Sequence, residues 1–136
     1  METYMLHRLL IASGLTLTLT ACQMAPAGIE VTMEPMELTP RIMEKTRTVV
    51  TYNFKDPDTA KLRDEFGFRL SSGDIAVCGE YNARNSYGAY TGYKPYYVRL
   101  RETSVGLEMK AIRVETLATA ACDQLFNGPT ILVEED

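Results

Sequence analysis

Residues 66–82 read FGFRL-SSGD-IAVCGEYN, and they indicate the fold class more directly than any other part of the chain. Two runs rich in apolar residues, 66–70 and 75–82, stand on either side of a four-residue turn at 71–74. A Gly-Asp pair between two such runs is typical of a β-hairpin. We therefore predict two antiparallel strands joined by a tight turn.

Further strands are expected after this hairpin. Residues 94–100 contain Tyr96, Tyr97 and Val98, and such aromatic and β-branched side chains favour a strand because they fit a pleated surface. The pattern of residues 105–114 is ambiguous and fits a fourth strand. The sequence thus predicts a sheet of three to four strands.

Helix signals occur on both sides of these strands in the chain. Thr39 suits an N-cap and Pro40 the first helical position, and apolar residues follow at helical spacing through 42–54. Residues 49–52 also suit a strand, so both structures stay open there. We predict another helix over 115–126, which the Asn-Gly-Pro sequence at 127–129 brings to an end.

A further short helix is expected from Asp56, which is a suitable cap, to Glu65. Together these elements predict an α+β domain, a small antiparallel sheet that carries an N-terminal and a C-terminal helix on one face. In this interpretation the chain consists of a signal peptide at 1–21, a tether at 22–40 and the domain at 41–136.

The N-terminus has the three zones of an export signal. His7 and Arg8 lie near its start, residues 9–19 are apolar, and small residues precede Cys22. The apolar run is too short to cross a bilayer, which takes about 20 apolar residues. The segment therefore predicts export and cleavage rather than a transmembrane anchor.

The residues Leu19-Thr20-Ala21-Cys22 resemble the lipobox of bacterial lipoproteins, an apolar residue followed by two small residues and a cysteine. The resemblance implies cleavage before Cys22, lipidation of this cysteine and anchoring in a membrane through its acyl chains. In Gram-negative lipoproteins, a residue other than Asp directly after the cysteine usually permits sorting to the outer membrane. Gln23 therefore implies the periplasmic face of the outer membrane rather than the inner membrane. An ordinary secretory signal with an incidental cysteine is the alternative.

Residues 22–40 contain three prolines and several acidic residues, a composition that favours a flexible tether between the lipid and the domain. Apolar residues between positions 29 and 38 leave a second possibility open. In that alternative the segment packs on the domain itself or on a partner.

Lipidation of Cys22 would leave Cys78 and Cys122 as a pair in an oxidising compartment. We expect them to form one disulfide, which would tie the C-terminal helix to the second strand. A buried pair of thiols and a redox site are the alternatives. The chain has no Cys-x-x-Cys motif, which argues against the redox site.

Six of the eight tyrosines lie between residues 77 and 97. This stretch resembles small exported proteobacterial proteins of unassigned function, in which Val-Cys-Gly-Glu is followed by Asn-x-x-Asn and by glycines that alternate with aromatic residues. The resemblance covers residues 40–126 and includes the Lys-Asp-Pro-Asp sequence at 55–58 and the late Cys122. It implies no activity. Ala89 departs from the pattern, because a second glycine is common at this position.

Three tyrosines of this stretch, Tyr87, Tyr90 and Tyr93, are three residues apart. Such rings can form a flat ledge that binds sugars or peptide backbones, and Arg84 and Asn85 complete this candidate ligand-binding site. In the alternative, the rings pack on the sheet while asparagines and glycines shape one long hairpin loop.

Another residue of this stretch, Glu80, is expected to pair across the sheet with a nearby arginine. The candidates are Arg84, Arg99 and Arg101.

Little in the chain points to catalysis. The sole histidine, His7, would leave with the signal, so no histidine would remain as a base or a metal ligand. No nucleophile-elbow, phosphate-loop or dinucleotide-binding motif occurs. We expect no enzyme activity, no catalytic residues, no metal and no cofactor.

The net charge of −4, without a basic stripe, argues against nucleic acid as a partner. The acidic residues 134–136 are interpreted as a solvated end. Two functions remain. The first is a lipid-anchored, non-enzymatic interaction protein that docks to another envelope protein, and an exposed sheet edge would favour it. The second is a peptidoglycan- or polysaccharide-binding module that uses the Tyr-rich loop at 81–97.

Overall fold

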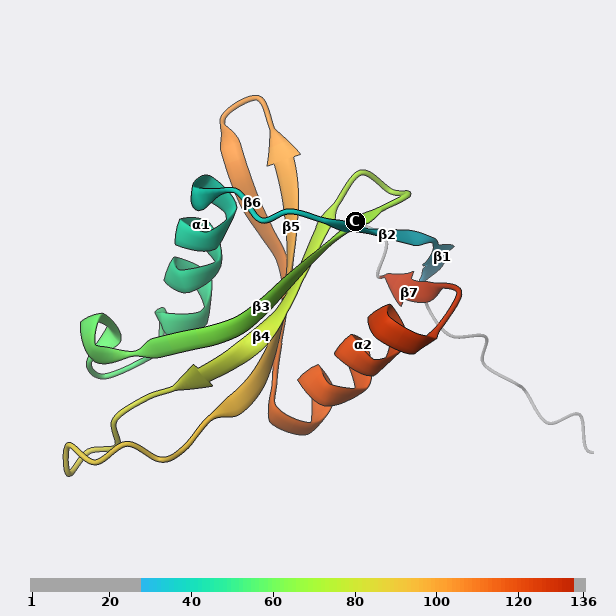
Figure 1. Ribbon diagram of the computed structural model, residues 1–136. Helices are drawn as coiled ribbons and strands as arrows, with labels where there is room; N and C mark the ends of the chain where they lie inside the picture. The colour runs from blue at the N-terminus through green and yellow to red at the C-terminus, as the bar shows by residue number, and fades with distance from the viewer. Residues whose placement is uncertain (1–27, 134–136) are drawn as a thin grey trace, which may run out of the picture.

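The computed structural model describes residues 28–133. Five strands form an antiparallel sheet in the order β2-β3-β4-β5-β6, and β1 pairs with β7 in a separate two-stranded sheet (Figure 1). The strands are β1 Ile29–Val31, β2 Met33–Met36, β3 Lys61–Leu70, β4 Ile75–Asn82, β5 Lys94–Thr103, β6 Gly106–Val114 and β7 Ile131–Val133. Two α-helices, α1 Pro40–Thr51 and α2 Glu115–Asn127, and a 3₁₀ turn, η1 Pro57–Thr59, complete the fold. The predicted α+β class and the two helices are confirmed.

The predicted hairpin is β3 and β4, and its turn closes as expected. The backbone N–H of Leu70 donates to the carbonyl of Asp74, and that of Gly73 donates to the carbonyl of Leu70, each at 2.9 Å. Gly73 has a φ of +90°, a conformation that glycine adopts without steric cost. The ambiguous segment at 105–114 is also a strand, because β6 pairs with β5 along its length.

The predicted short helix from Asp56 to Glu65 is wrong. Only the η1 turn is helical, and the chain is already a strand at Lys61, which lies opposite Asn82 of β4. The charged sequence at 61–65 permits a helix, but pairing with β4 satisfies the backbone of this segment in an extended form.

The sheet has more strands than the predicted three to four, because β2 comes from the segment that was expected to be a tether. Pro35 lies within β2, which is tolerated because β2 is an edge strand and needs no hydrogen bonds on its outer side. Residues 29–31 pair with β7 as well. The described part of the segment thus packs on the domain, the second alternative that the sequence left open.

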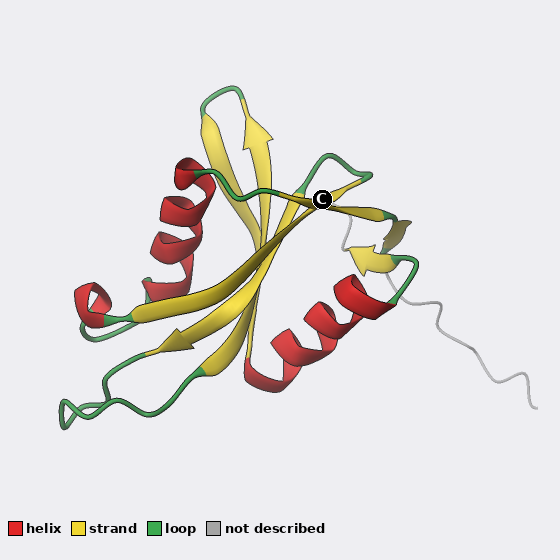
Figure 2. Cartoon of the chain, in the orientation of Figure 1, coloured by secondary structure: helices red, strands yellow, loops and turns green. Residues whose placement is uncertain are grey.

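The prediction that both helices lie on one face of the sheet is wrong, because α1 and α2 cover opposite faces (Figure 2). Side chains alternate along a strand, so Ile75 and Val77 of β4 pack on the α1 side while Ala76 and Cys78 pack on the α2 side. Both faces of β4 and β5 are therefore buried, which explains their long apolar runs.

Helix α1 begins where the sequence predicted. The side chain of Thr39 accepts a hydrogen bond from the backbone N–H of Ile42 at 3.4 Å, and Pro40 takes the first helical position. Helix α2 is tied to β4 by the predicted disulfide between Cys78 and Cys122, whose Cα atoms lie 6.0 Å apart. The disulfide prediction is confirmed.

On the α1 face, the ring of Tyr96 lies over Gly79. A Cβ atom at Gly79 would come within 2.7 Å of the Tyr96 hydroxyl, so this position requires glycine. The hydroxyl donates a hydrogen bond of 2.5 Å to the carboxylate of Glu65. Burial, together with this hydrogen bond, raises the pKa of Tyr96 far above its usual range. The phenol therefore stays neutral inside the core.

The predictions of a signal peptide at 1–21 and of lipidation at Cys22 lie outside the described residues. Within the described part of the chain, no helix is long and apolar enough to span a membrane.

Candidate functional site

The Tyr-rich loop connects β4 and β5 and is shaped by asparagine side chains and glycines. The side-chain oxygen of Asn85 accepts hydrogen bonds from the backbone N–H groups of Tyr87 and Ala89, at 2.9 and 3.1 Å. Asn82 accepts in the same way from Gly92, which has a φ of +93°. These bonds form the turns of a long hairpin loop.

The three tyrosines of the candidate ligand site have different surroundings. Tyr87 is 96% exposed. The hydroxyl of Tyr90 donates to the carbonyl of Thr59 at 2.9 Å, and the ammonium of Lys61 lies 4.6 Å from the centre of its ring. The guanidinium carbon of Arg84 lies 5.1 Å from the same ring centre.

Tyr93 is half-buried, and the guanidinium carbon of Arg63 lies 3.6 Å from its ring centre. Cation–π contacts therefore already involve two of the three rings. Asn85 bonds the backbone of its own loop, as the hairpin-loop alternative requires. Ligand binding by Tyr87, Tyr90, Tyr93, Arg84 and Asn85 stays a prediction.

Glu80 does not pair with any of the arginines named from the sequence. Its carboxylate contacts Arg63, with 2.7 Å between Glu80 Oε2 and Arg63 Nη2, because the two residues lie directly opposite each other in the β3–β4 register. The hydrogen bond with Glu80 raises the pKa of Arg63. Arg63 thus joins Glu80 to Tyr93.

The arginines Arg99 and Arg101 bind Asp74 instead. Asp74 is completely buried at the start of β4 and accepts from Arg99 Nη1 at 3.0 Å and from Arg101 Nε at 2.6 Å. Arg101 Nη2 donates to the same carboxylate at 3.1 Å, and the pKa of Arg101 is raised by this hydrogen bonding. The sequence places Asp74 in the predicted turn, and the bonds of Asp74 to these arginines were not predicted. The sequence did contain one indication of this arrangement. Arg99 and Arg101 stand at alternate positions of one strand, so their side chains lie on the same face of the sheet.

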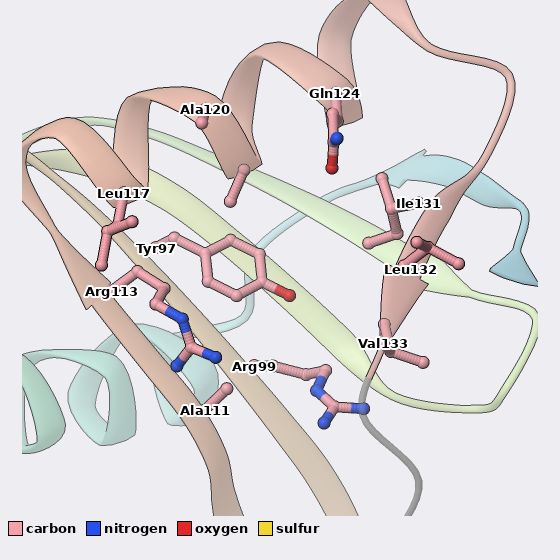
Figure 3. Close-up of a pocket in the computed structure, with 11 residues that line it drawn as sticks. Tyr97, Arg99, Ala111, Arg113, Leu117, Ala120, Gln124, Ile131, Leu132 and Val133 are labelled. Atoms are coloured by element: carbon pink, nitrogen blue, oxygen red, sulfur yellow. The ribbon is translucent and has the colours of Figure 1, made fainter. Parts of the chain in front are cut away.

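A cavity of about 270 Å³ lies on the α2 face, between α2, β5, β6 and β7 (Figure 3). We call it the α2 cavity. Its polar lining consists of Tyr97 and Arg99 from β5, Arg113 from β6 and Gln124 from α2. Figure 3 shows these side chains projecting into the hollow from the sheet below and from the helix above. Its apolar walls come from Leu117, Ala120, Ala121, Ile131, Leu132 and Val133.

A larger groove of about 630 Å³ lies on the α1 face, between the C-terminal half of α1 and β6. We call it the α1–β6 groove. Its lining is largely apolar and includes Val49, Phe54, Tyr81, Met109, Ile112 and Val114. Burial raises the pKa of Tyr81, so its phenol is neutral at the groove wall. Lys45 and Thr48 line this groove and also a second hollow beside the β5–β6 turn, so the depression continues along α1.

In the described residues, no group of three histidine, cysteine, aspartate or glutamate side chains is placed to hold a metal ion. Comparisons of the chain with protein-family models, with curated proteins and with solved structures find no match.

Proposed function

We propose that this protein is a non-enzymatic interaction protein of the cell envelope, anchored to the periplasmic face of the outer membrane through lipid on Cys22. In this proposal the α1–β6 groove receives an extended segment of a partner protein. The anchor rests on the lipobox-like residues 19–22. The docking site rests on the geometry of α1 and β6.

The observation that carries the docking proposal is the position of the groove beside a sheet edge. β6 is the last strand of the five-stranded sheet and pairs with β5 alone among the described strands. The outer side of an edge strand presents backbone N–H and C=O groups that an added strand can bond. Alternate side chains of such a strand would enter the groove.

The lining of the groove specifies the chemistry of the partner. A volume of about 630 Å³ is within the range of ligand pockets, roughly 300–1,000 Å³, and its apolar surface calls for apolar side chains at alternate positions. Lys45 lines the groove, and no acidic side chain of the described residues does. The partner segment therefore carries an acidic residue that reaches Lys45.

The test compares two apolar residues on opposite sides of the sheet. Met109 lines the α1–β6 groove and is 48% exposed, whereas Leu132 lies on β7 and is 51% exposed. Each is changed to Asp in the full chain, and the proteins that co-purify from cross-linked envelopes are quantified against wild type. We expect Met109→Asp to reduce one partner at least tenfold, because a buried carboxylate opposes docking, and Leu132→Asp to retain it.

Three results would contradict the docking proposal. These are a partner that both variants retain, a partner that both lose, and a second copy of this chain as the captured protein.

The lipid anchor is tested separately, by fractionation of cells that carry a Cys22→Ser chain. This chain is expected in the soluble fraction. If it stays in the outer membrane to the same extent as wild type, the lipid anchor is refuted.

A further inference from the structure

We propose that a hollow beside the Tyr-rich loop binds a carboxylated sugar. The hollow has a volume of about 350 Å³ and is lined by Lys55 and Asp56, which precede η1, and by residues 84–86 and Gly88 of the loop. We call it the loop hollow. This inference is independent of the α1–β6 groove, because the two hollows share no lining residue.

The two sides of the loop hollow come from distant parts of the sequence and are joined through Tyr90. The segment 55–59 and the Tyr-rich loop leave the same end of the sheet, because β3 begins opposite the residue at which β4 ends (Figure 1). The hydroxyl of Tyr90 donates to the carbonyl of Thr59 at 2.9 Å, and Tyr90 forms an antiparallel bridge with Arg84 inside the loop. These contacts place the loop beside the segment that precedes η1.

The tip of the loop takes its shape from its own hydrogen bonds. The backbone N–H of Asn85 donates to the carbonyl of Ala89 at 2.8 Å, and that of Gly88 donates to the carbonyl of Asn85 at 3.0 Å. The side-chain oxygen of Asn85 accepts two further backbone N–H groups of the tip. The lining of the hollow on this side is therefore formed before a ligand arrives, and the hydroxyl of Ser86 can hydrogen-bond a ligand.

The charges in the lining specify a ligand that is negative overall. Two cations, Lys55 and Arg84, stand against one carboxylate, that of Asp56. Within the described residues Lys55 and Arg84 form no ion pair, and Arg84 contacts the ring of Tyr90, with 5.1 Å between its guanidinium carbon and the ring centre. A cation–π contact uses the charge of a guanidinium and none of its N–H donors. Arg84 can therefore bond a carboxylate while it keeps this contact.

The carboxylate of Asp56 shows that the ligand also carries hydrogen-bond donors. Asp56 stands at the N-cap of η1, where the sequence favours a capping bond, yet its side chain forms no such bond and lines the hollow instead. A carboxylate only accepts hydrogen bonds, so Asp56 repels a simple anion and binds a hydroxyl group. A sugar with a carboxylate satisfies both sides of the lining.

The hollow includes only part of the ligand site that the sequence predicted. Arg84 and Asn85 line it, whereas the three tyrosines of the predicted ledge do not. Its volume lies within the range of ligand pockets, roughly 300–1,000 Å³, and suits one or two sugar rings.

The test titrates the isotope-labelled full chain with N-acetylmuramic acid and with D-glucuronate, and follows the amide signals of Ser86 and Gly88 by NMR. The neutral sugars N-acetylglucosamine and D-glucose are the matched controls without a carboxylate. We expect at least one acid to shift both signals and to bind at least tenfold more tightly than its neutral counterpart. The tighter of the two acids identifies the source, cell-wall glycan or uronic-acid polysaccharide.

Three results of this titration would overturn the proposal. These are no binding of either acid, neutral sugars that bind as tightly as the acids, and acetate that binds as tightly as the acids. The last result would mean that the hollow recognises anions in general.

Two variants assign the roles of the lining residues. Arg84→Gln is expected to weaken binding of the acid at least tenfold and to remove the preference for it over the neutral sugar. Asp56→Ala is expected to weaken binding of the acid as well, because a hydroxyl of the sugar loses its acceptor. Tighter binding by Asp56→Ala would overturn the proposal, since the loss of a negative charge strengthens a site for simple anions.

A matched control separates these effects from a general change in charge. Arg69→Gln removes the same charge as Arg84→Gln from an exposed position of β3 outside the hollow. A loss of binding in this control equal to that in Arg84→Gln would contradict the site. If Arg84→Gln does not fold, Lys55→Gln, at an exposed position of the lining, gives the same test with the same expected loss.

Discussion

The two helices lie on opposite faces of one sheet and are held there in different ways. Helix α1 buries Ile42, Thr46, Val50 and Thr51, and it packs on the aliphatic and aromatic side chains of β4 and β5. Helix α2 buries only Ala118 and Leu125. It is joined to β4 by the disulfide, which α1 lacks.

The two attachments show how a small domain can hold a helix that buries few large apolar residues. Each fully buried Ile or Val contributes about 1.5–3 kcal/mol, whereas an alanine has little surface to bury. A disulfide restricts the unfolded chain and does not depend on apolar area. The covalent bond therefore supplies part of the attachment that the few buried side chains of α2 do not provide.

The surfaces beside the two helices differ in chemistry as well. The α1–β6 groove is apolar and adjoins an edge strand, whereas the α2 cavity is smaller and has two arginines in its lining. We expect the α1 side to receive a protein segment. The substitutions below test the structural part of this comparison.

The largest effect is expected from removal of the disulfide. Cys78 and Cys122 are 44 residues apart, and on the chain-entropy model a loop of this length is worth about 4 kcal/mol. The double variant Cys78→Ala/Cys122→Ala should lose about this much free energy of unfolding in urea. In this variant, native-state amide hydrogen exchange should accelerate more in α2 than in α1. Equal acceleration in both helices would contradict the different attachment of the two.

The next largest effect is expected at Asp74. The change Asp74→Asn leaves Arg99 and Arg101 without their buried carboxylate, and breaking a buried ion pair costs about 3 kcal/mol or more. Asp58→Asn, at an exposed position of η1, is the matched control. Urea unfolding that gives the two variants the same stability, within about 0.5 kcal/mol, would show that this ion-pair cluster does not stabilise the α2 face.

The smallest effect is expected at Thr46 of α1, and it is a gain. Among the described residues, the Thr46 hydroxyl is the one buried side-chain oxygen without a hydrogen-bond partner. Thr46→Val replaces this hydroxyl with a methyl group of similar size and should raise the free energy of unfolding by about 1 kcal/mol. Thr48→Val, at an exposed position of the same helix, should give no such gain. A loss of stability in Thr46→Val would indicate that the hydroxyl is satisfied.

Local patterns in the sequence predicted the elements that depend on local chemistry. The turn at 71–74, the Thr39 cap and the end of α2 are each set by residues close together in the chain, and each was predicted correctly. The disulfide was also predicted, since Cys78 and Cys122 were the pair left after Cys22.

Features that depend on pairing over long distances were not predicted. Residues 61–65 are mostly charged and read as a helix, yet they form a strand because β4 lies beside them. Pro35 reads as part of a tether, yet it lies in an edge strand. The lining of the α2 cavity comes from four separate elements, so no stretch of sequence contains its pattern.

Site-specific photo-cross-linking in living cells tests directly whether the α1 side receives a protein partner and the α2 side does not. A photoreactive amino acid is placed at Met109 in one strain and at Leu132 in another. We predict one protein adduct, of a partner other than this chain, that forms at Met109 and is absent at Leu132. The same adduct at both positions, or an adduct at Leu132 alone, would contradict it.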